Sequence, residues 1–336
     1  MIKKILFISA FSVVFACKVQ KNKPISDADV VQYGETITSQ ELKDHLYTFA
    51  SDEFQGRDTG EPGQKKAANY LKNEYQNLDI ASPLGGDDYF QDIPSSFFDD
   101  KYNASENVVA YIKGSEFPDE IVVISAHYDH VGVDAQGNIY NGADDDGSGT
   151  VSMLEIAEAF KEAQNDGFSP RRSILFLHVT GEEKGLLGSD YYTKNPIFPL
   201  ENTVTGLNTD MIGRIDPKHK DDPNYIYLIG SDKLSTELHN LSESVNEEYT
   251  QLDLDYTYND ENDPNRFYYR SDHYNFAKHN IPVIFYFNGT HADYHKPTDT
   301  ADKIEYDLMT RRARLIFYTA WEVANRDNRL TVDKAK

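Results

Sequence analysis

The sequence predicts a single α/β domain in which a mixed, mostly parallel β-sheet lies between layers of helices. Short apolar runs alternate with segments of helical periodicity along the chain. Several of these runs are continuously apolar, as expected for strands that helices cover on both faces. The 336 residues contain neither an internal repeat nor a Gly/Ser-rich linker, and their length suits one large domain.

Six apolar runs predict strands, and seven periodic segments predict helices. In chain order the strands are NVVAYI (107–112), IVVISA (121–126), SILFLHV (173–179), TVTGLN (203–208), YIYLIG (225–230) and PVIFYF (282–287). The helices are 39–50, 63–77, 149–165, 185–194, 233–248, 271–280 and 303–325. In the first helix, Ser39 can act as the cap, and Leu42, Leu46 and Phe49 recur at helical spacing.

The charge of the chain excludes one class of partner. There are 33 Lys and Arg against 56 Asp and Glu, which gives a formal net charge of −23. Nucleic acid is therefore not expected as a partner, because phosphate binding needs a basic surface. Most of the acidic residues are expected on a solvated surface, although some of them could hold cations.

The first residues predict export. Lys3 and Lys4 precede the apolar run 5–16, which is too short to span a bilayer but suits the core of a signal peptide. The run ends in Val-Phe-Ala before Cys17, a pattern that resembles a bacterial lipobox. A buried N-terminal strand with an incidental cysteine is the alternative.

We therefore expect cleavage of a signal peptide, residues 1–16, and lipidation of Cys17. Residues 17–38 would form a lipidated N-terminus and polar tether, and 39–336 the folded domain, anchored in the bacterial cell envelope by the lipid alone. Cys17 is the only cysteine of the chain, so neither internal disulfides nor thiolate metal ligands are expected.

Acidic and imidazole side chains gather where the strands end. Open α/β sheets bind ligands beyond the carboxyl ends of their strands, which makes this edge the candidate site. The residues that follow the strands are His127, Asp129 and His130; Glu182 and Glu183; Asp210; and His291, Asp293, Tyr294 and His295. The run Asp144–Asp146 precedes the helix at 149.

Clusters of His, Asp and Glu without Cys are typical of catalytic Zn²⁺ or Mn²⁺ sites. Five or six such ligands exceed what one zinc ion needs, whereas two ions about 3.5–4 Å apart that share a carboxylate would use them all. Asp129 could accept the second ring N–H of a metal-bound His127. Glu182 and Glu183 project differently, so one could bind metal while the other acts as a base.

Simpler roles compete for several of these residues. His178 is expected to be a core histidine, and His130 is expected to be structural. Asp210 could cap a turn, and His291 competes with His295 for a place in the site. Any of the three consecutive aspartates could be a ligand on this reasoning alone.

A calcium-binding EF-hand loop is excluded for the aspartate run. With Gly147 at the sixth loop position, the first and twelfth positions are Gly142 and Met153. An EF-hand requires Asp and Glu at those two positions.

Five ordered motifs resemble those of a known family. HYDH, NGADDDGSG, TGEEKGLLGS, NTDMIG and DYHKPTDT are similar to the motif series of the aminopeptidase Y/bacterial leucyl aminopeptidase family of co-catalytic zinc peptidases, in peptidase clan MH. The resemblance runs from about residue 40 to the C-terminus. It implies a zinc-peptidase fold of the phosphorylase/hydrolase-like type, without the family's additional protease-associated domain.

The resemblance also implies a role for each site residue. The implied ligands are His127 and Asp210 for one zinc ion, Glu183 and His295 for a second, and Asp145 as the bridge between them. The remaining implied roles are Glu182 as general base, Asp129 as the partner of the His127 ring, and Tyr294 as a group that helps to hold the oxyanion. A cis peptide bond after the bridging aspartate is implied as well.

The expected function is hydrolysis of peptides by a two-zinc enzyme, most simply an aminopeptidase. The first alternative is a glutaminyl cyclase-like acyltransferase with one zinc ion, although such enzymes lack the DDDGSG pattern and carry Trp where this chain has Tyr294. The second alternative is a binding ectodomain without catalytic activity. Arg214 and Arg270 could bind a carboxylate of the substrate, but the simpler expectation is that they neutralise nearby acidic residues such as Asp216 and Asp272.

Overall fold

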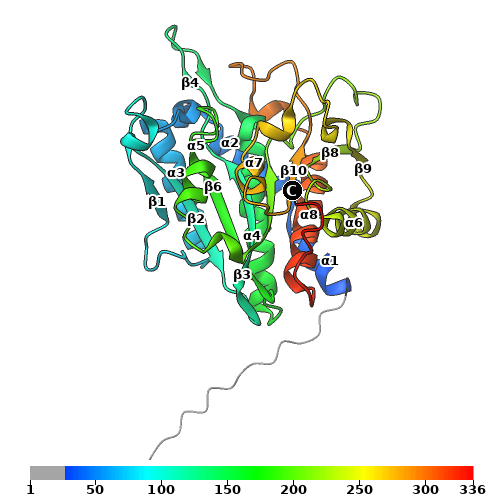
Figure 1. Cartoon of the computed structure of the whole chain (residues 1–336). Coiled ribbons are helices and arrows are strands. Elements are labelled where there is room, and N and C mark those ends of the chain that lie inside the picture. The colour runs from blue at the N-terminus through cyan, green and yellow to red at the C-terminus, as the bar shows by residue number, and fades with distance from the viewer. Residues whose placement is uncertain (1–26, 336) are drawn as a thin grey trace, which may run out of the picture.

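The computed structural model describes residues 27–335, and its centre is an eight-stranded sheet (Figure 1). The predicted signal peptide and Cys17 lie outside the described residues. From one edge to the other the strands are β1 (Phe90–Ile93), β2 (Ser105–Ile112), β6 (Arg172–Val179), β3 (Phe117–His127), β7 (Thr203–Thr209), β10 (Val283–Phe287), β8 (Tyr225–Ile229) and β9 (Asp253–Asp255).

The four central strands, β6, β3, β7 and β10, are parallel to one another. In register, Val123 of β3 lies between Leu175 of β6 and Gly206 of β7. Three pairs toward the edges are antiparallel, and β8 with β9 is parallel. The mixed, mostly parallel α/β sheet expected from the sequence is therefore confirmed. A small separate hairpin joins β4 (Gly132–Val133) to β5 (Ile139–Tyr140).

Helices cover both faces of the sheet, as Figure 1 shows. Alternate side chains of β3 enter two different apolar clusters: Val122 and Ile124 pack on one face, and Ile121 and Val123 on the other. The first face carries α1 (Asp27–Thr36), α2 (Ser39–Phe49), α3 (Pro62–Asn77), α4 (Gly149–Asn165), α6 (Thr236–Val245) and α8 (Tyr306–Asn325), and the second carries α5 (Leu187–Lys194) and α7 (His273–Ala277).

The N-terminal tether expected through residue 38 differs from the structure. Within the described residues, α1 occupies much of that segment, and Val30, Tyr33 and Ile37 are buried in the main core. The ring of Tyr33 stacks on Trp321 of α8 with 6.4 Å between centroids. The packed domain therefore includes residues before 39, because three spaced apolar residues in a polar segment suffice to seat a short helix. None of the helices in 27–335 is long and apolar enough to cross a membrane.

Candidate metal centre

The carboxyl ends of the four central strands carry most of the predicted site residues. His127 is the last residue of β3, and Asp210 directly follows β7. Glu182 and Glu183 come shortly after β6, and His295 lies in the loop that leaves β10. Parallel strands end at the same edge, so these segments, which lie far apart in the sequence, meet there.

Asp145 lies between two groups of possible metal ligands. Its Oδ1 is 3.2 Å from His127 Nε2, which is in turn 3.6 Å from Asp210 Oδ1. Its Oδ2 is 2.9 Å from His295 Nε2, which is 3.2 Å from Glu183 Oε2. The five residues that the resemblance implies as ligands are thus brought together, with one oxygen of Asp145 facing each group.

The residues present suit a cation. His127 Nε2, Asp145 Oδ2 and Glu183 Oε1 are buried and make no well-aligned hydrogen bond within residues 27–335. Buried polar atoms are normally paired, so atoms that converge without pairing indicate a missing partner. His127, Asp145 and Asp210 lie close enough together to hold one ion. Imidazole and carboxylate ligands without thiolate are those of catalytic zinc.

The charges of the centre are strongly coupled. Burial opposes the charged form of His127, but the carboxylates of Glu182 and Asp210 outweigh it and raise the pKa of His127 well above its ordinary value. In the same way, burial is outweighed by Asp145 and Glu183 at His295, whose pKa rises to about 10. The carboxylates therefore hold positive charge tightly, and a metal cation would supply that charge in place of protons.

The other two aspartates of the run are used as hydrogen-bond acceptors. Asp144 Oδ1 accepts from the backbone N–H of Gly213 at 2.7 Å, and Asp144 Oδ2 lies 3.1 Å from His291 Nε2. Asp146 Oδ1 accepts from the N–H of Gly149 at 2.9 Å and from that of Met211 at 3.0 Å. Both side chains thus hold neighbouring loops, and His291 contacts Asp144 rather than either ligand group.

The backbone of Asp145 is held by another carboxylate. Asp299 Oδ2 accepts from the N–H of Asp144 at 2.9 Å and from the N–H of Asp145 at 3.2 Å. The peptide bond between Asp145 and Asp146 is cis, as the resemblance implied.

The ring of His127 is oriented by a backbone carbonyl. His127 Nδ1 donates to the carbonyl oxygen of Asp129 at 3.0 Å, whereas the carboxylate of Asp129 lies at 3.8 Å. With Nδ1 engaged in this way, Nε2 is the ring nitrogen that is directed at Asp145 and could bind a metal ion. The carboxylate of Asp129 instead accepts from Thr59 Oγ1 at 2.8 Å and from the backbone N–H of Glu182 at 3.1 Å.

His130 lies inside the centre, although the sequence suggested a structural role. It is fully buried, and its Nδ1 is 2.8 Å from Glu183 Oε1 and 3.7 Å from Asp145 Oδ2. His130, Asp145 and Glu183 form a second group whose ligand atoms could hold an ion. The position of His130 three residues beyond His127, just past the same strand, was the available signal.

A small cavity of about 30 Å³ adjoins the centre and is here called the catalytic cavity. Its walls combine polar residues of the centre with apolar side chains. The lining residues are Asp145, Glu182, Asp210, Met211, Phe267, Arg270, Phe285, Phe287, Thr290 and Tyr294. The ring of Tyr294 stacks on that of His295, with 4.0 Å between centroids.

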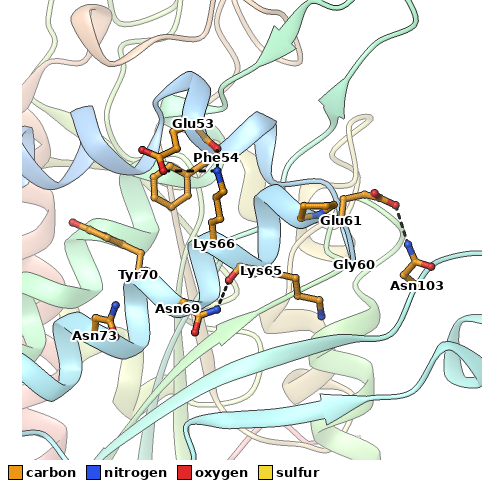
Figure 2. Close-up of a pocket in the computed structure, with 11 residues that line it drawn as sticks. Glu53, Phe54, Gly60, Glu61, Lys65, Lys66, Asn69, Tyr70, Asn73 and Asn103 are labelled. Carbon is orange, nitrogen blue, oxygen red and sulfur yellow. Dashed lines mark hydrogen bonds and ion pairs between the residues drawn. The ribbon is translucent and has the colours of Figure 1, made fainter.

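A larger hollow lies elsewhere. Figure 2 shows an open groove of about 790 Å³ beside α3, where Lys66 reaches Glu53 and Asn103 donates to Glu61. Its polar side chains are mostly paired with one another, and none of the residues of the metal centre lines it. The chemistry is therefore assigned to the smaller cavity.

Comparison with known proteins places the chain in a family. The model of peptidase family M28 matches residues 107–320, which contain all five motifs. Leupeptin-inactivating enzyme 1 of Streptomyces exfoliatus is 28% identical over 259 residues, which are 77% of this chain and 50% of that protein. A probable zinc metalloprotease of Pyricularia oryzae is 28% identical over 258 residues, covering 65% of this chain and 50% of the relative. The chain thus spans about half the length of these curated relatives.

Solved structures share the fold. LapA aminopeptidase of Legionella pneumophila superposes with a TM-score of 0.71 at 21% identity, covering 97% of this chain and 81% of that one. A leucine aminopeptidase precursor of Bacteroides thetaiotaomicron gives 0.67 at 16% identity, covering 85% and 97%. The likeness extends over nearly the whole described domain, and the family match covers the strands and loops that build the centre. On these grounds the chain belongs to peptidase family M28.

Proposed function

We propose that this protein is a two-zinc peptidase that releases N-terminal residues from peptides. The observation that carries the proposal is Asp145, whose two oxygens each face a separate group of His, Asp and Glu ligands. The names of the relatives support it, since they include zinc metalloproteases and aminopeptidases.

The proposed ligands are His127 and Asp210 for one ion, Glu183 and His295 for the other, and Asp145 for both. Bound zinc would supply Lewis-acid polarisation of the scissile carbonyl and of the attacking water. We assign His130 a positioning role: its Nδ1 lies 2.8 Å from Glu183 Oε1, so its ring limits where that ligand can lie.

Glu182 is the proposed general base. It is only partly buried, and it lines the catalytic cavity together with Asp145 and Asp210. Burial is the main cause that raises the pKa of Glu182 well above its ordinary value, which strengthens it as a proton acceptor. The bond from its backbone N–H to Asp129 holds it in place. Glu182 would accept a proton from the attacking water and pass it to the leaving amine.

The remaining walls of the catalytic cavity would receive the substrate. Met211, Phe267, Phe285 and Phe287 offer an apolar surface to the side chain of the N-terminal residue. Tyr294 has a pKa raised by burial, so its hydroxyl stays protonated and can donate to an oxyanion.

Export and lipidation of Cys17, with attachment to the cell envelope, remain part of the proposal. Mass spectrometry of the protein extracted from membranes would test it. A diacylated or triacylated Cys17 at the mature N-terminus is expected, and an unmodified Cys17 inside an uncleaved chain would contradict it.

Two measurements test the function. Zinc is counted per chain by elemental analysis, and hydrolysis is measured for Leu-Ala-Ala-amide and its N-acetylated form. Two zinc ions and cleavage of only the free peptide are expected. One zinc ion with cyclisation of N-terminal glutamine would indicate a cyclase, and absence of zinc and of turnover would indicate a binding protein.

A further inference from the structure

Arg270 stands apart from the other arginine near the centre. Arg214 pairs with Asp293 at 2.9 Å and lies 3.7 Å from Asp299, so it neutralises acids as expected, although Asp216 is not among them. Arg270 was expected to neutralise Asp272 in the same way, and the structure differs. Asp272 is fully buried and accepts a hydrogen bond from Ser189 Oγ at 2.5 Å. No carboxylate within the described part of the chain lies within 4.0 Å of the guanidinium of Arg270.

The guanidinium of Arg270 lies on the wall of the catalytic cavity. Its Cζ is 4.8 Å from the centre of the Phe267 ring, which lines the same cavity. Its charge also acts on Tyr294 across the cavity, where it opposes the dominant effect of burial on the pKa of that hydroxyl. Arg270 is the only Lys or Arg among the described residues that line this cavity.

Arg270 shares its cavity with several acidic side chains. Acidic residues outnumber basic ones 56 to 33, and Asp145, Glu182 and Asp210 line the same cavity. Once two divalent cations bind, they offset the charges of the carboxylates, and the positive charge of Arg270 is left for an incoming anion. A guanidinium binds a carboxylate through two parallel hydrogen bonds, which gives it geometric selectivity.

We propose that Arg270 recognises the side-chain carboxylate of an acidic N-terminal residue, and that peptides beginning with glutamate are therefore substrates. The inference rests on the proposed function and names a substrate class for the same site. The methylene groups of glutamate contact the apolar wall formed by Phe267, Phe285 and Phe287, while its carboxylate meets the guanidinium. The same chemistry could be offered by the terminal carboxylate of a dipeptide, and the experiment separates these two sources.

The test compares Arg270→Gln, Arg270→Lys and the wild type on peptide amides that differ only in their first residue. Glu-Ala-Ala-amide and Gln-Ala-Ala-amide are nearly the same size, so their ratio of kcat/KM reports recognition of the charge. Leu-Ala dipeptide and Leu-Ala-amide report recognition of a terminal carboxylate. Arg266→Gln is the matched control, because it removes a charge from the same loop, where its Cζ lies 4.8 Å from the Tyr269 ring and outside the cavity.

We expect Arg270→Gln to lower the Glu-to-Gln ratio of kcat/KM about tenfold or more, the size of a lost hydrogen bond to a charged group. Arg270→Lys should restore part of the ratio, and Arg266→Gln should leave it unchanged. A Glu-to-Gln ratio that Arg270→Gln does not alter would overturn the inference. So would a loss confined to the ratio of Leu-Ala to Leu-Ala-amide, because the recognised group would then be the terminal carboxylate.

Calorimetric binding of the two tripeptide amides to the zinc-loaded protein gives a readout that does not depend on turnover. If neither peptide is cleaved but Arg270 still controls tighter binding of the glutamate peptide, the proposed function fails and the carboxylate site stands. If leucine peptides are cleaved without any Glu-to-Gln preference in rate or binding, the carboxylate site alone fails.

Discussion

Replacing Arg57 by lysine should destabilise the protein far more than a conservative exchange of one cation for another usually does. The Arg57 side chain is completely buried. Its Nε donates to the carbonyl of Tyr128 at 2.9 Å, and Nη1 donates to the carbonyls of Phe49 at 3.2 Å and Asn141 at 2.6 Å. Nη2 donates to the carbonyl of Gly142 at 2.8 Å. One guanidinium therefore joins a helix end, the segment after β3 and the entrance to the aspartate run.

The magnitude follows from the number of acceptors. A lysine ammonium at the end of a single flexible chain can serve one of these diverging carbonyls well, which leaves about three of the four without their donor. Each lost bond of this kind costs about 1–1.5 kcal/mol, so the free energy of unfolding should fall by about 3–5 kcal/mol. The positive charge is retained, so charge loss does not enter this value.

Urea unfolding followed by far-UV circular dichroism would measure the change. Arg171→Lys is the matched control, because Arg171 forms ion pairs with the more exposed Glu116 and Asp327, and such surface pairs contribute about 1 kcal/mol or less. If Arg57→Lys fell within about 1 kcal/mol of the wild type, the four hydrogen bonds could not have the stabilising role assigned to them here.

Three other predictions concern the centre and the pH dependence of stability. Glu182→Gln should keep both zinc ions but lower kcat at least about 100-fold, and near-normal turnover with full zinc would contradict its role as base. His295→Ala should retain one zinc ion per chain at saturating zinc, whereas His130→Ala should retain two zinc ions with about 10- to 100-fold weaker affinity. Elemental analysis after zinc titration distinguishes the two variants. An equal loss of zinc in both would refute the assignment. Burial and neighbouring glutamates raise the pKa of Glu158 to about 7, so its contribution to stability is full below about pH 4.5 and is lost as the pH rises through 7. Glu158→Gln should reduce this loss of stability between pH 5 and 7 in urea unfolding, by less than about 1 kcal/mol because the side chain is partly exposed to solvent. An unchanged pH dependence would contradict this prediction.

The sequence predicted the centre of the sheet well and its edges poorly. All six expected strands are present, because buried strands need apolar residues on both faces and such runs are easily recognised. The edge strands β1 (Phe90–Ile93) and β9 (Asp253–Asp255) were not predicted, since FQDI and DLD are mostly only partly buried and show no apolar run. Their strand conformation depends on pairing with a neighbour, which a single segment does not reveal.

Within the site, the sequence identified which residues gather but not how they contact one another. Residue types and strand ends pointed to His127 and to the glutamate pair. Resemblance, rather than chemistry, selected Asp145 from the three aspartates, and only the structure shows that its neighbours are engaged elsewhere. The place of His130 in the centre was not predicted, because the residue that it contacts there, Glu183, is distant in the sequence.

The loop that carries His295 also carries Asp299, and through these two residues the last motif positions Asp145. His295 contacts the carboxylate of Asp145, while Asp299, four residues later, accepts from the amide of Asp145. One short stretch of chain therefore contacts both the carboxylate and the backbone amide of Asp145. The spacing of DYHKPTDT therefore sets the position of Asp145 relative to the two proposed ions. An inserted or deleted residue between His295 and Asp299 would displace one of these contacts relative to the other. It should weaken both proposed zinc sites together, even though the other three proposed ligands lie on other segments.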